Sequence, residues 1–255
     1  MMAESFYIGW DVGGWNCDRN PNSRDAIVIL DNALAIVGRP WRGNLRTPIN
    51  EAEATANWLA ALFELCCTVP PTGAVHATLG IDTPLGFSDE FLRLASTLEA
   101  VKTLEESRTN PYLYRRTERY LLKSGIIPLS AITHMIGNQA TKGMHVLAKF
   151  AKTRESCGVW SDGVCLTAIE AYPSACKGSA TIGKLRDRIR PLEHKDQEDA
   201  LTCALTAYLF TTQREALVLP KPDVSSNEGW IWVPRDAIYP KIARKSHLEQ
   251  LPTGD

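Results

Sequence analysis

Short apolar runs that end on an acidic residue are the feature of this sequence that most constrains its fold. Three strand-like runs stop directly at Asp11, Asp82 and Glu170. Gly13-Gly14 follows the first run and Pro84 the second, and proline cannot continue a central strand because it lacks the backbone N–H. Segments in which apolar residues recur at helical spacing lie between these runs. The alternation predicts an α/β fold, in which a mixed sheet carries helices on its faces.

The remaining periodic segments extend this pattern. Two further strands are predicted at residues 26–30 and 33–37, paired as a hairpin. Helical spacing predicts one helix that is capped by Asn50 and another over residues 196–212. The region of about 88–155 is mostly helical in pattern, and no internal repeat or low-complexity linker divides the chain. We therefore expect a single domain over residues 1–255, with a helical insertion at about 88–155.

The overall charge excludes one class of function. The 28 basic and 29 acidic side chains leave a net charge of −1, which rules out a polybasic coat protein for nucleic acid. Any nucleic-acid site must therefore concentrate its basic residues locally. The N-terminus lacks a signal-peptide pattern and no run approaches the roughly 18 apolar residues that cross a bilayer, so a cytoplasmic protein without a membrane partner is expected. Seven cysteines without a CxxC pair indicate free thiols.

The acidic residues at the strand ends are candidate metal ligands. Because the carboxyl ends of parallel strands meet at one edge of a sheet, Asp11, Asp82 and Glu170 could converge there. Asp196 and Asp199 begin a helix and project from one of its faces at a spacing of three. Clustered carboxylates repel one another unless a cation neutralises them, and hard oxygen ligands suit Mg²⁺ or Mn²⁺. The pattern predicts metal-dependent phosphoryl chemistry.

Each of these acids also has a structural interpretation. Asp11 and Asp82 could be turn residues, since aspartate is common there. Asp196 could serve only as a helix cap, and Glu170 could pair with an arginine. Their joint occurrence in this order along the chain favours the metal site over the four separate explanations.

Six segments of the chain share their order with a known family. They are Ile8–Asp11, Gly80–Gly86, Tyr114–Glu118, Ile169–Pro173, His194–Ala200 and Gly229–Pro234. Together they resemble the predicted nucleases of domain of unknown function 429, which belong to the ribonuclease H-like superfamily alongside Holliday-junction resolvases. The resemblance covers roughly residues 5 to 240.

The resemblance implies both an architecture and an activity. It implies a ribonuclease H-like mixed sheet of five main strands, the first three antiparallel, with the helical insertion between strands four and five. It implies metal ligands at Asp11, Asp82, Asp196 and Asp199, and Glu170 matches the Glu-x-Tyr-Pro pattern of the family as a further catalytic candidate. The implied activity is that of a nuclease, in which water activated by Mg²⁺ or Mn²⁺ hydrolyses phosphodiester bonds of DNA or RNA.

Candidate substrate-binding residues lie in a segment that interleaves arginines with tyrosines. Within residues 108–123, Arg115, Arg116 and Arg119 could hold a phosphate backbone by charge while the tyrosines stack on bases. The alternative is a solvated helix with its tyrosines in the core. A second basic stretch at 184–195 adjoins the acidic pair of the last helix, and a flexible basic loop is its alternative interpretation.

Two other classes of function stay open. The Asp11–Gly14 segment also resembles the first phosphate loop of ATP-dependent sugar kinases and actin-like proteins. Those proteins need two copies of the fold and a second glycine-rich loop, for which a chain of 255 residues without a repeat is short. A non-catalytic binding protein that retains a ribonuclease H-like fold is the other class, and the presence of all four matched aspartates argues against it.

Overall fold

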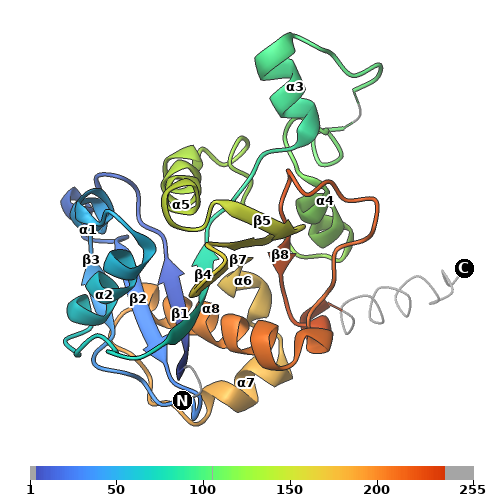
Figure 1. Ribbon diagram of the computed structural model, residues 1–255. Helices are drawn as coiled ribbons and strands as arrows, with labels where there is room; N and C mark the ends of the chain where they lie inside the picture. Colours follow the sequence, from blue (N-terminus) through green and yellow to red (C-terminus); the bar gives the residue numbers. More distant parts are fainter. Residues whose placement is uncertain (1–3, 105, 239–255) are drawn as a thin grey trace, which may run out of the picture.

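One mixed β-sheet of eight strands organises the chain (Figure 1). The computed structural model describes residues 4–104 and 106–238, so the ends of the predicted domain, 1–3 and 239–255, lie outside the described residues. The strand order is β3-β2-β1-β4-β7-β6-β5, and β8 pairs with β7. The strands are β1 Glu4–Asp11, β2 Asp25–Leu30, β3 Trp41–Gly43, β4 Val75–Asp82, β5 Thr153–Ser156, β6 Val159–Ser161, β7 Leu166–Ala171 and β8 Ile231–Trp232.

The directions of the central strands bring three strand ends to one edge. β1 runs antiparallel to β2 and β2 antiparallel to β3, whereas β4 is parallel to β1 and β7 is parallel to β4. In this register Asp11 is the partner of Asp82, and Ile81 is the partner of Glu170. The last residue of β1 therefore lies beside the last residue of β4, and Glu170 in β7 is level with the residue before Asp82.

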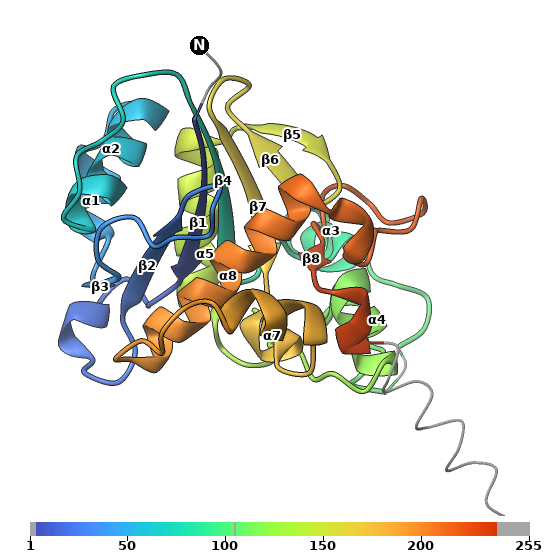
Figure 2. The same cartoon turned by 90° about the horizontal axis from the view of Figure 1, so that it is seen from below.

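Helices cover both faces of the sheet (Figure 2). Along β1, Phe6, Ile8 and Trp10 join a core with α1, α2 and α5, whereas Tyr7 joins the core under α8. This alternation is the period of two expected for a strand that is buried on both faces. The helices are α1 Arg46–Glu51, α2 Thr55–Leu65, α3 Asp89–Thr97, α4 Arg116–Lys123, α5 Gly137–Phe150, α6 Pro173–Cys176, α7 Ala180–Arg186 and α8 Lys195–Thr212, with short 3₁₀ turns at Cys17–Arg19 and Arg214–Ala216.

Two glycines allow α8 to lie directly on the sheet. Gly9 and Gly80 are partners in adjacent strands, and both face the helix. A β-carbon on Gly9 would overlap the Ala200 carbonyl oxygen, and one on Gly80 would lie 2.5 Å from the Cys203 carbonyl oxygen. Because such atoms cannot approach so closely, any larger residue at either position would force the helix away from the sheet.

The expected fold class is confirmed, since the structure is α/β with a mixed sheet flanked by helices. The β5–β6 hairpin and β8 extend the sheet beyond the five main strands expected. The helices α3, α4 and α5 fall within the predicted insertion, and α5 packs on the sheet. No helix among residues 4–104 and 106–238 is long and apolar enough to cross a membrane.

Two local predictions are wrong. Residues 33–37 form only a single bridge, Ile36 to Leu30, because the Asp31 carboxylate accepts hydrogen bonds from the N–H groups of Ala33 and Ala35 and holds the segment in a turn. The third strand is β3 instead. Asn50 does not cap a helix, because it lies inside α1, and α2 begins separately at Thr55.

The close approach of α8 yields a test of the packing. We expect Gly9→Ala to lower the free energy of unfolding by about 2–3 kcal/mol, because the added methyl group would displace the backbone of α8. Gly73→Ala is the matched control, because a β-carbon there meets no atom within 4 Å. Urea denaturation of the two variants measures the difference, and equal stabilities would show that α8 is free to shift.

Candidate active site

An acid-lined pocket opens at the carboxyl edge of β1, β4 and β7. Its volume is about 330 Å³, and it also contains the first turn of α8. All five acidic residues predicted for the site line it: Asp11, Asp82, Glu170, Asp196 and Asp199. We call this hollow the acid pocket. The structure thus brings together residues that are spread over most of the chain.

Asp11 and Asp82 are the pair at its centre. They are register partners at the ends of neighbouring parallel strands. Burial, reinforced by the carboxylates of Asp82, Asp199 and Asp196, holds the pKa of Asp11 well above its ordinary value. Burial, reinforced by Asp199 and Glu170, raises the pKa of Asp82 to about 8. Neither carboxylate accepts a hydrogen bond from the residues that the structure describes, so no donor offsets their repulsion.

Asp199 lies on the wall of the acid pocket that α8 forms. Burial raises the pKa of this carboxyl group, whereas the positive charges of Lys195 and Lys177 oppose the rise. The Lys195 ammonium group lies 3.9 Å from the carboxylate and is itself largely exposed. Two cationic side chains thus lie close to Asp199, and the charge of Lys195 also opposes the raised pKa of Asp82.

The carboxylate of Asp196 accepts hydrogen bonds from two arginines. Its Oδ2 accepts hydrogen bonds from Nε of Arg42 at 2.7 Å and from the backbone N–H of Arg24 at 3.0 Å. The interpretation of Asp196 as a helix cap is wrong, because His194 occupies that position, with a capping box to Gln197. The carboxylate instead ties the start of α8 to the loop before β2 and to β3.

Glu170 is also fully engaged, in a buried ion pair. Its two oxygens accept hydrogen bonds from the Arg115 guanidinium at 2.6 and 2.8 Å, and Oε2 also accepts one from the N–H of Leu85 at 2.9 Å. Arg115 pairs with Glu118 as well. The pairing with an arginine, one of the alternatives for Glu170, is the one that the structure adopts.

The three predicted substrate-binding arginines do not form a surface at the site. Arg115 is only 2% exposed, because its guanidinium group is surrounded by Glu118, Glu170 and a backbone carbonyl group. Arg116 is exposed but pairs with Asp223, and none of the three lines the acid pocket. The assignment of Arg115 to substrate binding is therefore wrong, since a buried, doubly paired arginine cannot meet a phosphate.

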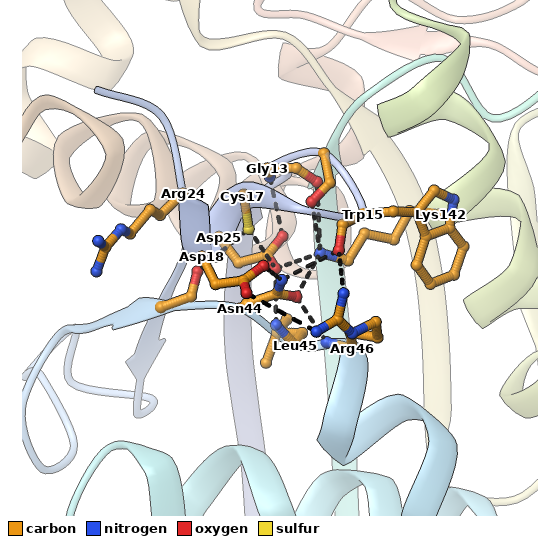
Figure 3. Close-up of polar contacts among 12 residues, drawn as sticks. Gly13, Trp15, Cys17, Asp18, Arg24, Asp25, Asn44, Leu45, Arg46 and Lys142 are labelled. Atoms are coloured by element: carbon orange, nitrogen blue, oxygen red, sulfur yellow. Dashed lines mark hydrogen bonds and ion pairs between the residues drawn. The ribbon is translucent and has the colours of Figure 1, made fainter. Parts of the chain in front are cut away.

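A buried lysine and aspartate support the loop that follows Asp11 (Figure 3). Oδ1 of Asp25 accepts hydrogen bonds from the N–H of Gly13 at 2.9 Å and from the Trp10 indole at 3.0 Å. Oδ2 accepts one from the N–H of Leu45 at 2.7 Å and forms an ion pair with Lys142, whose side chain is fully buried. The residues on either side of Asp11 are thus tied to one carboxylate.

Lys142 also contacts the backbone of the same loop. Its ammonium group lies 3.4 Å from the carbonyl oxygens of both Gly13 and Gly14 and 3.4 Å from the side-chain oxygen of Asn44. The Trp15 ring centroid lies 5.8 Å away. The sequence does not predict the role of this lysine, because a lysine on an amphipathic helix is usually exposed and Lys142 is buried. Asp25 does indicate a buried partner, because it begins a strand whose other residues are all apolar.

Two of the acidic residues that line the acid pocket suit a divalent cation, but the predicted set of four does not form a metal site. No group of three or more His, Cys, Asp or Glu side chains that could hold a metal ion is found within residues 4–104 and 106–238. The predicted set of four aspartates is therefore not assembled, and Asp196 is the member committed elsewhere, to Arg42. Asp11 and Asp82 remain as adjacent carboxylates without donors, and Mg²⁺ is commonly held by one or two carboxylates together with water and substrate phosphates.

Comparison with known proteins leaves the chain without a match: no family model, no curated protein and no solved structure is similar to it.

The ion pair beneath the Gly13–Gly14 loop predicts a large loss of stability on mutation. Lys142→Met leaves the Asp25 charge buried and unpaired, so we expect the free energy of unfolding to fall by about 3–5 kcal/mol. The double variant Asp25→Asn/Lys142→Met removes both charges and should recover part of the loss. Urea denaturation of the wild type and both variants tests this, and a single variant as stable as the wild type would contradict it.

The raised pKa of Asp82 predicts a pH dependence of stability. Between about pH 4 and pH 8 the folded protein retains a proton that the unfolded chain releases, so the free energy of unfolding falls as the pH rises. The substitution Asp82→Asn removes the contribution of this carboxyl group to the pH dependence. We expect the variant to be more stable than the wild type at pH 8 in the presence of EDTA.

The matched control is Asp187→Asn, a substitution at an exposed position. Urea denaturation at several pH values would give the two slopes. The assignment fails if Asp82→Asn and Asp187→Asn show the same dependence on pH as the wild type.

Proposed function

We propose that this protein is a nuclease that uses Mg²⁺ or Mn²⁺ to hydrolyse phosphodiester bonds in DNA or RNA. The observation that carries the proposal is the pairing of Asp11 with Asp82 across adjacent parallel strands, in one pocket with Asp199. Burial, reinforced by neighbouring carboxylates, raises the pKa of Asp11 and of Asp82, and neither receives a hydrogen bond from the described residues. A cation bound between them would remove that repulsion, as clustered carboxylates require.

In this proposal Asp11 and Asp82 would hold the cation, and Asp199, on the facing helix, would act on the water and not as a ligand. A cation held there would supply positive charge for the phosphate group and would lower the pKa of a bound water. Oδ atoms of Asp199 lie on the same pocket and would accept the proton of the attacking water. Lys195, 3.9 Å from Asp199, would add positive charge beside the leaving group.

Two further acids have positioning roles in the proposal. Glu170 accepts the N–H of Leu85, three residues after Asp82, and is itself clamped by Arg115, so it fixes the chain that leaves β4. Asp196, bound to Arg42, fixes the start of α8 and with it Asp199. Both oxygens of Glu170 accept hydrogen bonds, and Oδ2 of Asp196 accepts two, so we assign neither carboxylate to the reacting atoms.

The fold supports kinship with the ribonuclease H-like nucleases of domain of unknown function 429. This kinship is supported by the antiparallel order of β1, β2 and β3, with β4 next to β1 and β7 next to β4. Asp11 ends an interior strand of this sheet, and the aspartate pair begins the long helix that packs on it. This agreement of acid positions with fold supports the same chemistry.

Binding of ATP phosphates at the Asp11–Gly14 segment is disfavoured by the contacts of the loop. The N–H of Gly13 donates to Asp25, and the carbonyl groups of Gly13 and Gly14 face Lys142. A phosphate loop needs free N–H groups directed at the ligand. If the wild type cleaves none of the substrates in the assay described below, the non-catalytic alternative is favoured.

The proposed activity predicts a strict requirement for Asp11 and Asp82. With Mn²⁺ present, we expect the wild type to cleave members of a panel of single-stranded, duplex and branched DNA and RNA substrates. We expect Asp11→Asn and Asp82→Asn each to lower the rate by at least about a hundredfold. Glu53→Gln, which removes a charge at an exposed position outside both the acid pocket and residues 184–195, should retain the wild-type rate.

Calorimetric titration with Mn²⁺ separates binding of the cation from cleavage. The wild type should bind Mn²⁺ more tightly at pH 8 than at pH 6, because protons compete for the same carboxylates, and the Asp82→Asn variant should bind weakly at both. If the wild type binds no Mn²⁺, or if the two variants cleave as fast as the wild type, the proposed site is wrong.

A further inference from the structure

A second hollow adjoins the acid pocket on the other side of the first turn of α8. It lies among α6, α7 and α8 and has a volume of about 450 Å³. Lys195 and Asp199 line both hollows, so the two meet at these residues. The second hollow is also lined by Lys177 and Arg186. The surface thus changes from acidic to basic across a single helical turn.

The chain around this hollow is the most basic part of the region near the site. Residues 177–195 contain six basic side chains against two acidic ones, in a protein whose net charge is −1. Arg186 is committed to an ion pair with Glu198. The others are exposed: Lys177, Lys184, Arg188, Arg190 and Lys195. We call these five side chains the basic rim.

Most of the basic rim has no acidic partner. Among the described residues, only Lys195 approaches a carboxylate within ion-pair distance, that of Asp199. The other four members are exposed and form no ion pair with the described part of the chain. Such charges, carried by the end of α6, by α7 and by the segment that follows α7, are available to an external anion.

The other arginine-rich segment cannot take this role. Arg115 is buried against Glu170, and Arg116 is paired with Asp223. The projecting α3 (Figure 1) is acidic in its first turn, at Asp89 and Glu90. The basic stretch at 184–195 begins in the last turn of α7, which packs on α8, and continues as a non-helical segment over residues 187–194.

We infer that the basic rim binds the phosphate backbone of a nucleic acid strand that crosses the first turn of α8 into the acid pocket. The direction of the strand rests on the proposed function, whereas the binding of a phosphodiester chain does not. Lysine and arginine charges of this kind contact phosphates without reading bases, so the binding should be independent of sequence and sensitive to salt.

Fluorescence anisotropy with a labelled single-stranded DNA of about 15 nucleotides tests the inference, and an RNA of the same sequence forms the second arm. The buffer contains EDTA, so that binding is measured without cleavage. Lys184→Glu/Arg188→Glu reverses two charges of the basic rim. The control Arg93→Glu/Lys102→Glu makes the same change in net charge at exposed positions on and after α3.

We expect the rim variant to raise the dissociation constant by at least about tenfold and to weaken its dependence on salt. The logarithmic slope should fall by about 0.7 for each phosphate group that the variant no longer binds. The control should stay within about twofold of the wild type. The inference is overturned if the wild type binds neither oligonucleotide, or if both variants weaken binding equally, since the effect would then be one of net charge.

The same proteins separate this inference from the proposed function. If the rim variant loses binding but the wild type cleaves no substrate with Mn²⁺, the basic rim stands and the nuclease proposal fails. If the wild type cleaves and the rim variant binds and cleaves equally well, the activity stands and the inferred strand path is wrong.

Discussion

The close approach of α8 to the sheet is the steric constraint on which the rest of this structure depends. Gly9 and Gly80 are adjacent in the sheet, and the backbone of α8 occupies the space that their side chains would fill. Ala200 and Ala204, on the facing side of the helix, are fully buried. Because the helix lies so close, its first turn reaches the strand ends, and Asp199 shares a pocket with Asp11 and Asp82.

The acidic residues gathered at this edge divide into two groups by their partners. Glu170 and Asp196 have arginines within hydrogen-bond distance, so their charges are neutralised within the protein. Asp11 and Asp82 accept no hydrogen bond from the described residues, and burial together with repulsion from neighbouring carboxylates raises their pKa values. The paired acids hold the loops and the helix in place, and this support leaves the unpaired acids close together despite their repulsion.

The sequence predicted the location of the acidic site residues better than the location of the basic ones. Strand ends can be located from apolar runs and from Gly or Pro residues that stop them, and the parallel order of strands then brings the acids to one edge. An arginine between tyrosines on a helix has no comparable signal, and Arg115 proved to be buried. Its partner Glu170 is 55 residues away. The apolar run at 33–37 misled for a local reason, since the Asp31 side chain captures its N–H groups.

By itself the sequence determined the α/β class, the strands that end on acids and the helix that begins with an aspartate pair, because periodicity and chain-breaking residues act over a few positions. The tertiary structure alone decided which charges are neutralised. Asp25 meets Lys142 across 117 residues and Arg42 meets Asp196 across 154. Ion pairing falls off within a few ångströms, so it depends on contacts that only the packed fold creates.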